Sequence, residues 1–157
     1  PLMIVLVVDD DRLTRALMSR TLSRLGCSVS TAENGEIALE MIVGRKRDLH
    51  AEPSLDCPME VDESETEPFT YNYDVIFLDN QMPIASGLEV VTKLREMGRQ
   101  DFVVGVTGDV LVEDQREYLE AGVNHVLTKP VFEASLIEML SIAEERRRKG
   151  CSLVEHS

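Results

Sequence analysis

Acidic, hydroxyl and amine side chains follow four separate apolar segments of this 157-residue chain. Asp9 and Asp10 follow the run LMIVLVV, Asp79 closes the run DVIFLD, and Thr107 and Lys129 follow two further apolar runs. Three carboxylates brought together would repel one another, and a hard divalent cation, Mg²⁺ or Mn²⁺, would offset that repulsion. A carboxylate can also attack a phosphoryl group, whose oxygens a lysine and a hydroxyl can hold. These residue types therefore predict Mg²⁺-dependent phosphoryl transfer, provided that the fold brings them together.

Each of these side chains has a simpler structural explanation when it is taken alone. Asp9 or Asp11 could cap the N-terminus of a helix, where aspartate is favoured. Asp79 could be a turn residue, Lys129 a solvated surface lysine and Thr107 an ordinary strand residue. The functional prediction depends on the coincidence of all four segments, not on any one side chain.

Alternating strand-like and helix-like segments would have to position these residues. Short apolar runs rich in β-branched residues predict strands that are buried on both faces. The expected strands are Leu2–Val8, Ser28–Ala32, Asp74–Asp79, Phe102–Thr107 and His125–Thr128. The expected helices are Arg12–Leu25, Glu36–Val43, Gly87–Met97, Val112–Ala121 and Phe132–Lys149.

This alternation implies right-handed βαβ units and an α/β fold. The pattern matches the flavodoxin-like, doubly wound plan, in which a five-stranded parallel sheet of order 2-1-3-4-5 carries helices on both faces. Ligands bind at the carboxyl ends of the strands in such sheets. The candidate residues all stand at such ends, so we expect them to converge on one shallow pocket.

One segment breaks the alternation. Between Gly44 and Tyr71 the chain is polar and irregular, with three prolines and an acidic cluster. We expect a long polar insertion at about residues 45–72, which contributes little to the core. Residues 1–149 would then form one domain with this insertion, and residues 150–157 would form a C-terminal tail.

The net charge of -13 comes from 29 acidic and 16 basic residues. This balance argues against nucleic acid as a partner of the domain, because phosphate binding requires clustered lysine and arginine. No apolar run approaches the roughly 20 residues that span a bilayer. Cys27, Cys57 and Cys151 form no C-x-x-C pair, which fits reduced thiols and a cytoplasmic location. Pro1 stands directly before the first strand-like run, which suggests a segment of a longer protein that could itself be anchored in a membrane.

The runs LVVDDD, IFLDNQMP, VVGVTGD and VLTKP together resemble the signature segments of the CheY-like receiver domains of two-component phosphorelays. By this resemblance, Asp79 would accept the phosphoryl group. Asp10 would bind the metal ion directly and Asp9 through water, while Gln81 would offer its main-chain carbonyl. Thr107 would contact the phosphoryl group.

The resemblance also implies an ion pair between Lys129 and the phosphoryl group, and a cis bond between Lys129 and Pro130. The insertion is one departure from the family pattern, because it is about 25 residues longer than such a connection needs. The other departure is Val126, which stands where many family members have an aromatic switch residue. We therefore expect the signal to leave through Thr107 and the loop from Gly108 to Glu113 instead of through a rotating ring.

The resemblance implies a phosphohistidine donor, either a histidine kinase or a histidine phosphotransfer protein. The domain alone would catalyse its own phosphorylation and dephosphorylation. The insertion and Val126 favour the receiver of a hybrid histidine kinase, and a stand-alone response regulator is the alternative. An Asp-nucleophile phosphohydrolase is less favoured, because Gln81 stands where such an enzyme needs a second acid. A flavin or nucleotide binder would need a phosphate-binding loop where this chain has three aspartates.

Overall fold

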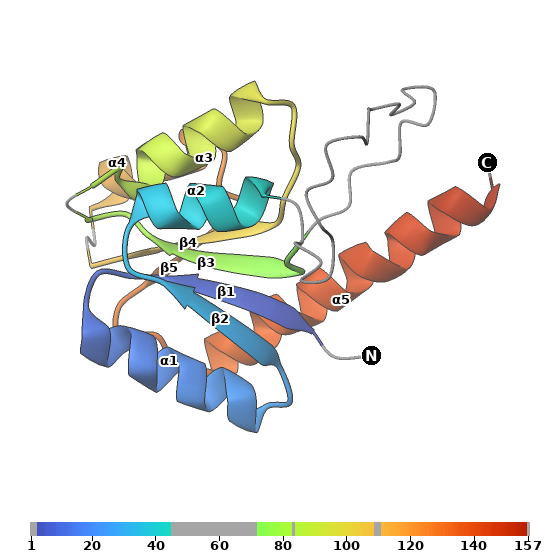
Figure 1. The fold of residues 1–157 in the computed structure, drawn as a ribbon, viewed down its shortest axis with the longest axis horizontal. Coiled ribbons are helices and arrows are strands. Elements are labelled where there is room, and N and C mark those ends of the chain that lie inside the picture. Colours follow the sequence, from blue (N-terminus) through green and yellow to red (C-terminus); the bar gives the residue numbers. More distant parts are fainter. Residues whose placement is uncertain (1–2, 45–71, 83, 109–110, 157) are drawn as a thin grey trace, which may run out of the picture.

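A five-stranded parallel sheet forms the centre of the molecule (Figure 1). The computed structural model describes residues 3–44, 72–82, 84–108 and 111–156. The strand order is β2-β1-β3-β4-β5, which confirms the flavodoxin-like prediction. The strands are β1 (Ile4–Val8), β2 (Ser28–Ala32), β3 (Val75–Asp79), β4 (Val103–Thr107) and β5 (His125–Thr128).

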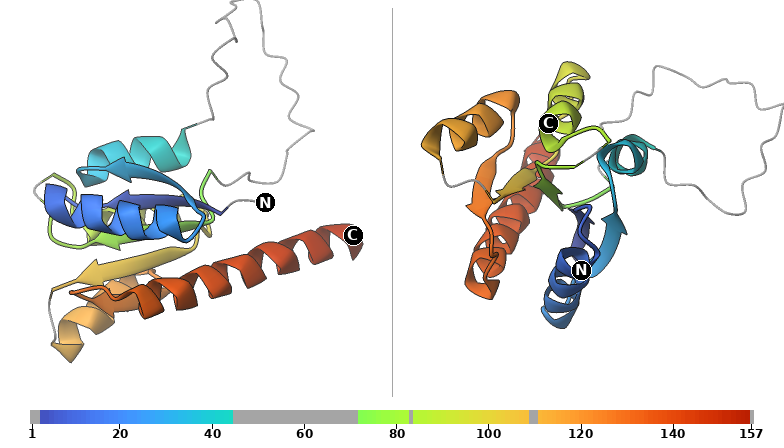
Figure 2. Two further views of the ribbon diagram at one scale, coloured as in Figure 1. Left: turned by 90° about the horizontal axis from the view of Figure 1, so that it is seen from below. Right: turned by 90° about the vertical axis from the view of Figure 1, so that its left-hand side faces the viewer.

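Helices cover both faces of this sheet (Figure 2). On one face lie α1 (Arg12–Arg24) and α5 (Glu133–His156). On the other face lie α2 (Gly35–Val43), α3 (Gly87–Glu96) and α4 (Val112–Ala121).

The central strands are buried on both sides, which explains their continuous apolar sequence. In β1, Val5 and Val7 pack with α1 and α5, whereas Leu6 and Val8 pack with the helices of the opposite face. Side chains alternate between the two faces along a strand, so only an unbroken apolar run can satisfy both cores.

Most predicted boundaries agree with the structure to within two residues, because local signals define them. Asp11 caps α1, since its carboxylate accepts a hydrogen bond from the Thr14 main-chain N–H at 3.2 Å. Gly26 and Gly122 follow α1 and α4 with φ angles of 96° and 126°, a conformation that favours glycine.

The predicted end of the last helix at Lys149 is wrong. α5 continues through Gly150 to His156, so most of the expected C-terminal tail is helical. A single glycine inside a helix costs only about 1 kcal/mol relative to alanine, which is too little to end a helix by itself. In Figures 1 and 2 the distal part of α5 extends past the end of the sheet.

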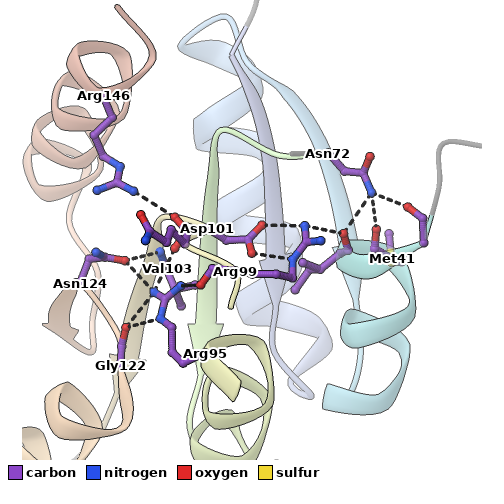
Figure 3. A network of polar contacts seen from close by, with 12 residues as sticks. Met41, Asn72, Arg95, Arg99, Asp101, Val103, Gly122, Asn124 and Arg146 are labelled. Carbon is purple, nitrogen blue, oxygen red and sulfur yellow. Dashed lines mark hydrogen bonds and ion pairs between the residues drawn. The ribbon is translucent and has the colours of Figure 1, made fainter. Parts of the chain in front are cut away.

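The expected insertion lies almost entirely outside the described residues, which resume at Asn72. The Asn72 side-chain amide donates hydrogen bonds to three carbonyl oxygens at the C-terminal end of α2, at 3.0, 3.1 and 2.7 Å (Figure 3). The accepting residues are Met41, Ile42 and Gly44. Carbonyl groups at a helix end lack partners within the helix, so Asn72 satisfies them.

A buried ion pair lies in the same network. The Arg99 guanidinium donates to both carboxylate oxygens of Asp101, at 2.9 and 3.2 Å, and also to the carbonyl oxygen of Ile42 (Figure 3). These contacts join the α3–β4 connection to the end of α2.

Within the described residues, no helix combines the length and apolar composition that a membrane span requires.

Candidate functional site

The predicted site residues lie at one edge of the sheet, where the strands end. Asp9 directly follows β1, Asp79 is the last residue of β3, and Thr107 is the last residue of β4. Val8 pairs with Leu78 in the register of β1 and β3, so Asp9 and Asp79 lie at the same level on adjacent strands. The predicted convergence of these strand ends is therefore confirmed.

Asp9, Asp10 and Asp79 form one carboxylate cluster. One oxygen from each side chain lies within 4.8 Å of the other two. Asp9 and Asp79 are only 1% and 3% exposed, whereas Asp10 is exposed. Clustered hard oxygen donors with one solvent-facing member suit a small divalent cation that keeps several of its water ligands. The donor set of this chain therefore fits Mg²⁺.

Lys129 joins this cluster from the end of β5. Its ammonium nitrogen lies 3.1 Å from the Asp9 carboxylate and 3.3 Å from the Asp79 carboxylate. Partial burial alone would lower the pKa of Lys129, but Asp79 and Asp9 favour the charged form and raise this pKa above its ordinary value. Lys129 is therefore a permanent positive charge between two buried carboxylates.

The pKa of Asp79 is raised to about 6. Burial is the main cause, and the negative charge of Asp9 adds to it. Lys129 acts in the opposite direction, as does a hydrogen bond from the main-chain N–H of Gln81. Without a metal ion, the pocket thus holds more negative charge than its own lysine can offset.

Thr107 is the last residue of β4, and Gln81 lies in the loop after β3. The Thr107 side chain is buried at the end of β4, and its main-chain carbonyl accepts a hydrogen bond from the Lys129 N–H at 2.8 Å. Gln81 is exposed in the loop after β3, two residues from Asp79. The peptide bond between Lys129 and Pro130 is cis, as the resemblance implied.

Two residues that support the site were not predicted. Arg15 of α1 donates from its guanidinium to the Asp9 carbonyl oxygen at 2.7 Å. Asn80 accepts a hydrogen bond from the Leu88 N–H at 3.2 Å, which ties the loop after β3 to the start of α3. The place of Asn80 directly after a strand-ending aspartate could have indicated it, but nothing in the sequence distinguishes Arg15 from other helix arginines.

Comparison with known proteins identifies the family. The model of the response regulator receiver domain matches residues 64–141. The chain is 33% identical over 138 residues to the two-component response regulator ARR22 of Arabidopsis thaliana, covering 87% of this chain and 80% of ARR22. The chain belongs to the response regulator receiver domain family.

Some relatives of this receiver domain are much longer. It is 29% identical over 147 residues to the sensor histidine kinase RcsC of Salmonella typhi, covering 94% of this chain but only 13% of RcsC. Among solved structures, a receiver domain of the Francisella response regulator 1452 is 25% identical, with a TM-score of 0.69, and covers 92% of this chain and 98% of that chain. Its relatives thus include both short response regulators and long histidine kinases. This agrees with both predicted parent proteins, the hybrid histidine kinase and its alternative, the stand-alone response regulator.

Receiver domains work with a phosphodonor such as a histidine kinase and bind Mg²⁺ at an acidic site. This chain has a cluster of three aspartates that could hold such an ion. One of the two departures from the family pattern, Val126, lies within the described residues. Val126 on β5 is partly buried and packs against the core beneath α2, α3 and α4, so this receiver has no aromatic ring at that position.

Proposed function

We propose that Asp79 accepts a phosphoryl group from a phosphohistidine and that Lys129 holds the transferred group. The single observation that carries this proposal is the Lys129 ammonium, which lies 3.1 and 3.3 Å from two carboxylates of the Asp9, Asp10 and Asp79 cluster. A buried carboxylate that faces a lysine at the carboxyl edge of a parallel sheet is arranged to attack, and the lysine is arranged to bind the oxygens of the group under attack.

The transfer step forms one bond and breaks one bond. A carboxylate oxygen of Asp79 attacks the phosphorus atom, so that an acyl phosphate O–P bond forms. The P–N bond of the phosphohistidine breaks, and its electron pair returns to the imidazole nitrogen, which then takes up a proton. The Lys129 ammonium and the Thr107 hydroxyl are proposed to bind two of the phosphoryl oxygens. Lys129 would then contact the phosphoryl group in place of part of its present contact with the Asp79 carboxylate.

The metal ligands in this proposal are carboxylate oxygens of Asp9, Asp10 and Asp79 and the main-chain carbonyl oxygen of Gln81. Asp9 would act through water and Asp10 directly. Bound Mg²⁺, with Mn²⁺ as a substitute, would offset the negative charge of the carboxylates and of the phosphoryl oxygens. The support lies in the chain itself, because one lysine faces three carboxylates, two of which are buried.

The donor in this proposal is a histidine kinase or a histidine phosphotransfer protein, and the domain belongs to a hybrid histidine kinase. The likeness to RcsC supports this parent architecture, and the likeness to ARR22 supports a short response regulator as the alternative. We place the domain in the cytoplasm, because its three cysteines form no C-x-x-C pair and fit reduced thiols. Nucleic acid is not a partner of this acidic domain in the proposal.

Intact-mass measurement after incubation with acetyl phosphate and Mg²⁺ tests the assignment. The parent chain should gain the mass of one phosphoryl group, and an Asp79→Asn variant should gain none. Asp74→Asn is the matched control, because Asp74 is a carboxylate that directly precedes the same strand and accepts a hydrogen bond from the Ile4 N–H at 2.8 Å. Equal phosphorylation of Asp79→Asn and the parent would disprove the proposed role of Asp79.

A further inference from the structure

α4 buries one of its side chains completely in the core of the receiver. All ten residues of this helix are described, and Tyr118, at 1% exposure, is the one that is buried. The apolar side chains of Val112 and Leu119 are 66% and 46% exposed. The residue before the helix, Leu111, makes no side-chain capping hydrogen bond. Tyr118 is therefore the residue of α4 that reaches deepest into the core, and Ala121 packs partly buried against the same core.

Two glycines leave the space that the Tyr118 side chain fills. A Cβ atom at Gly105, in the middle of β4, would overlap the tyrosine ring. A Cβ atom at Gly87, the first residue of α3, would overlap the hydroxyl oxygen and would also lie 2.6 Å from the carbonyl oxygen of Asp79. Neither glycine has a positive φ angle. Close approach of the tyrosine is thus the reason for a glycine at position 105, and close approach of both the tyrosine and the main chain after β3 is the reason at position 87.

The hydroxyl group of Tyr118 contacts the main chain next to Asp79, the proposed phosphoacceptor. It donates a hydrogen bond of 2.6 Å to the carbonyl oxygen of Leu78, and this bond is buried. Leu78 directly precedes Asp79 and pairs with Gly105 in the register of β3 and β4. A carbonyl oxygen has two lone pairs, so it can accept this bond in addition to a bond of the sheet. One hydrogen bond therefore connects α4 to the peptide group that carries Asp79.

We propose that Tyr118 is a positioning residue for phosphoryl transfer: its hydroxyl holds the Leu78–Asp79 peptide in place for attack and ties α4 to the state of that peptide. The proposal rests on the proposed function, because it requires Asp79 to be the phosphoacceptor. In this proposal Tyr118 is an aromatic residue on α4 that connects the helix to the Leu78–Asp79 peptide. The receiver has Val126 where many family members have an aromatic residue on β5. Both side chains pack in the same core.

The test compares two tyrosine-to-phenylalanine variants of the full chain. Tyr118→Phe keeps the ring that fills the space beside Gly105 and removes only the hydroxyl group. Tyr73→Phe is the matched control, because Tyr73 is a half-buried tyrosine near the start of β3, whose hydroxyl bonds with Ser30 instead of with the site. The initial rate of phosphorylation by acetyl phosphate is measured by intact mass at increasing Mg²⁺ concentrations.

The maximal rate of Tyr118→Phe should fall by about three- to tenfold, the rate equivalent of one neutral hydrogen bond. The Mg²⁺ concentration that gives half of the maximal rate should stay unchanged, because the carboxylates remain in place. Tyr73→Phe should match the parent in both quantities. Circular dichroism of the variants at the assay temperature ensures that the rates are compared between folded proteins.

Two results would overturn the positioning role. One is a maximal rate for Tyr118→Phe that equals that of the parent and of Tyr73→Phe. The other is a parallel loss of Mg²⁺ affinity, which would mean that the substitution disturbs the whole pocket. Asp79→Asn separates this proposal from the proposed function: a variant that still gains phosphate disproves the role of Asp79, whatever Tyr118→Phe does.

Discussion

The ammonium nitrogen of Lys129 lies 3.3 Å from a carboxylate oxygen of Asp79, although the two residues are 50 positions apart in the chain. The same nitrogen lies 3.1 Å from Asp9, so one positive charge serves two buried carboxylates. The pocket therefore carries excess negative charge until a cation or a proton enters it. We therefore expect the stability of the protein to change with pH, with metal binding and with substitution of these residues. The charges in the pocket determine the direction of each change.

Replacing Asp79 by asparagine should stabilise the metal-free protein at neutral pH. The pKa of Asp79 is raised to about 6 in the folded state, so the folded protein holds this proton more tightly than the unfolded chain does. The contribution of Asp79 to stability is then present at low pH and is lost as the pH rises through about 6. Asp79→Asn cannot lose a proton, so it should avoid this loss.

Melting curves of the parent and Asp79→Asn in EDTA measure the effect. At about pH 7.5 the variant should be more stable by on the order of 2 kcal/mol, and the difference should shrink toward about pH 4. Added Mg²⁺ should stabilise the parent more than the variant, which has lost one of the proposed metal ligands. A variant that melts below the parent in EDTA and keeps the full Mg²⁺ shift would show that the carboxylates do not share a site.

Removing the lysine should have the opposite effect. Lys129→Gln leaves Asp9 and Asp79 without their positive partner, so the metal-free protein should lose about 1–3 kcal/mol of unfolding free energy near neutral pH. The loss should be smaller at low pH, where Asp79 is protonated. Lys149→Gln is the control, because the pair that Lys149 forms with Glu145, at 4.0 Å, is exposed. Equal losses in the two variants, measured by urea unfolding, would contradict a special role for Lys129.

Asp10 offers the cleanest test of metal binding, because it is the exposed member of the cluster. Asp10→Asn should lower Mg²⁺ affinity at least about tenfold, since loss of an outer-shell partner alone costs that much in many metal sites. Asp11→Asn removes the same charge one position away, and asparagine still caps α1. Calorimetric Mg²⁺ titration should therefore separate the two variants. Similar affinities would indicate a general effect of charge and no direct ligand.

The two ion pairs Arg99–Asp101 and Arg24–Glu133 should differ strongly in their contribution to stability. Arg24 and Glu133 approach to 2.7 Å but are 60% and 47% exposed, so Glu133→Gln should cost less than about 1 kcal/mol. Arg99 and Asp101 are 10% and 1% exposed, so Asp101→Asn, which leaves a buried positive charge, should cost about 3 kcal/mol. Urea unfolding measures both, and a larger loss for Glu133→Gln would contradict this assignment. Phosphorylation of Asp79 should persist in both variants.

Much of the fold follows from short-range sequence patterns. Continuous apolar runs placed β1, β3 and β4 to within two residues, and the predicted bounds of β2, α4 and β5 match the structure residue for residue. The strand order follows from the alternation of strands and helices. The same reasoning predicted that Asp9, Asp10, Asp79 and Lys129 meet at one edge, because parallel strands end together. The chemical roles of these residues remain predictions, as does the small contribution expected of the insertion, which lies outside the described residues.

The sequence by itself thus determined the strands, their order and the edge at which the acidic residues gather, since each depends on patterns within a few residues. Only the tertiary structure decided which side chains touch. The bond from Tyr118 to Leu78 and the Arg99–Asp101 pair depend on packing between separate elements. So does the raised pKa of Asp79, because burial and the charge of Asp9 act through space. The end of α5 was also not predictable from local sequence patterns. The free-energy penalty of one glycine in a helix is too small to decide where the helix ends.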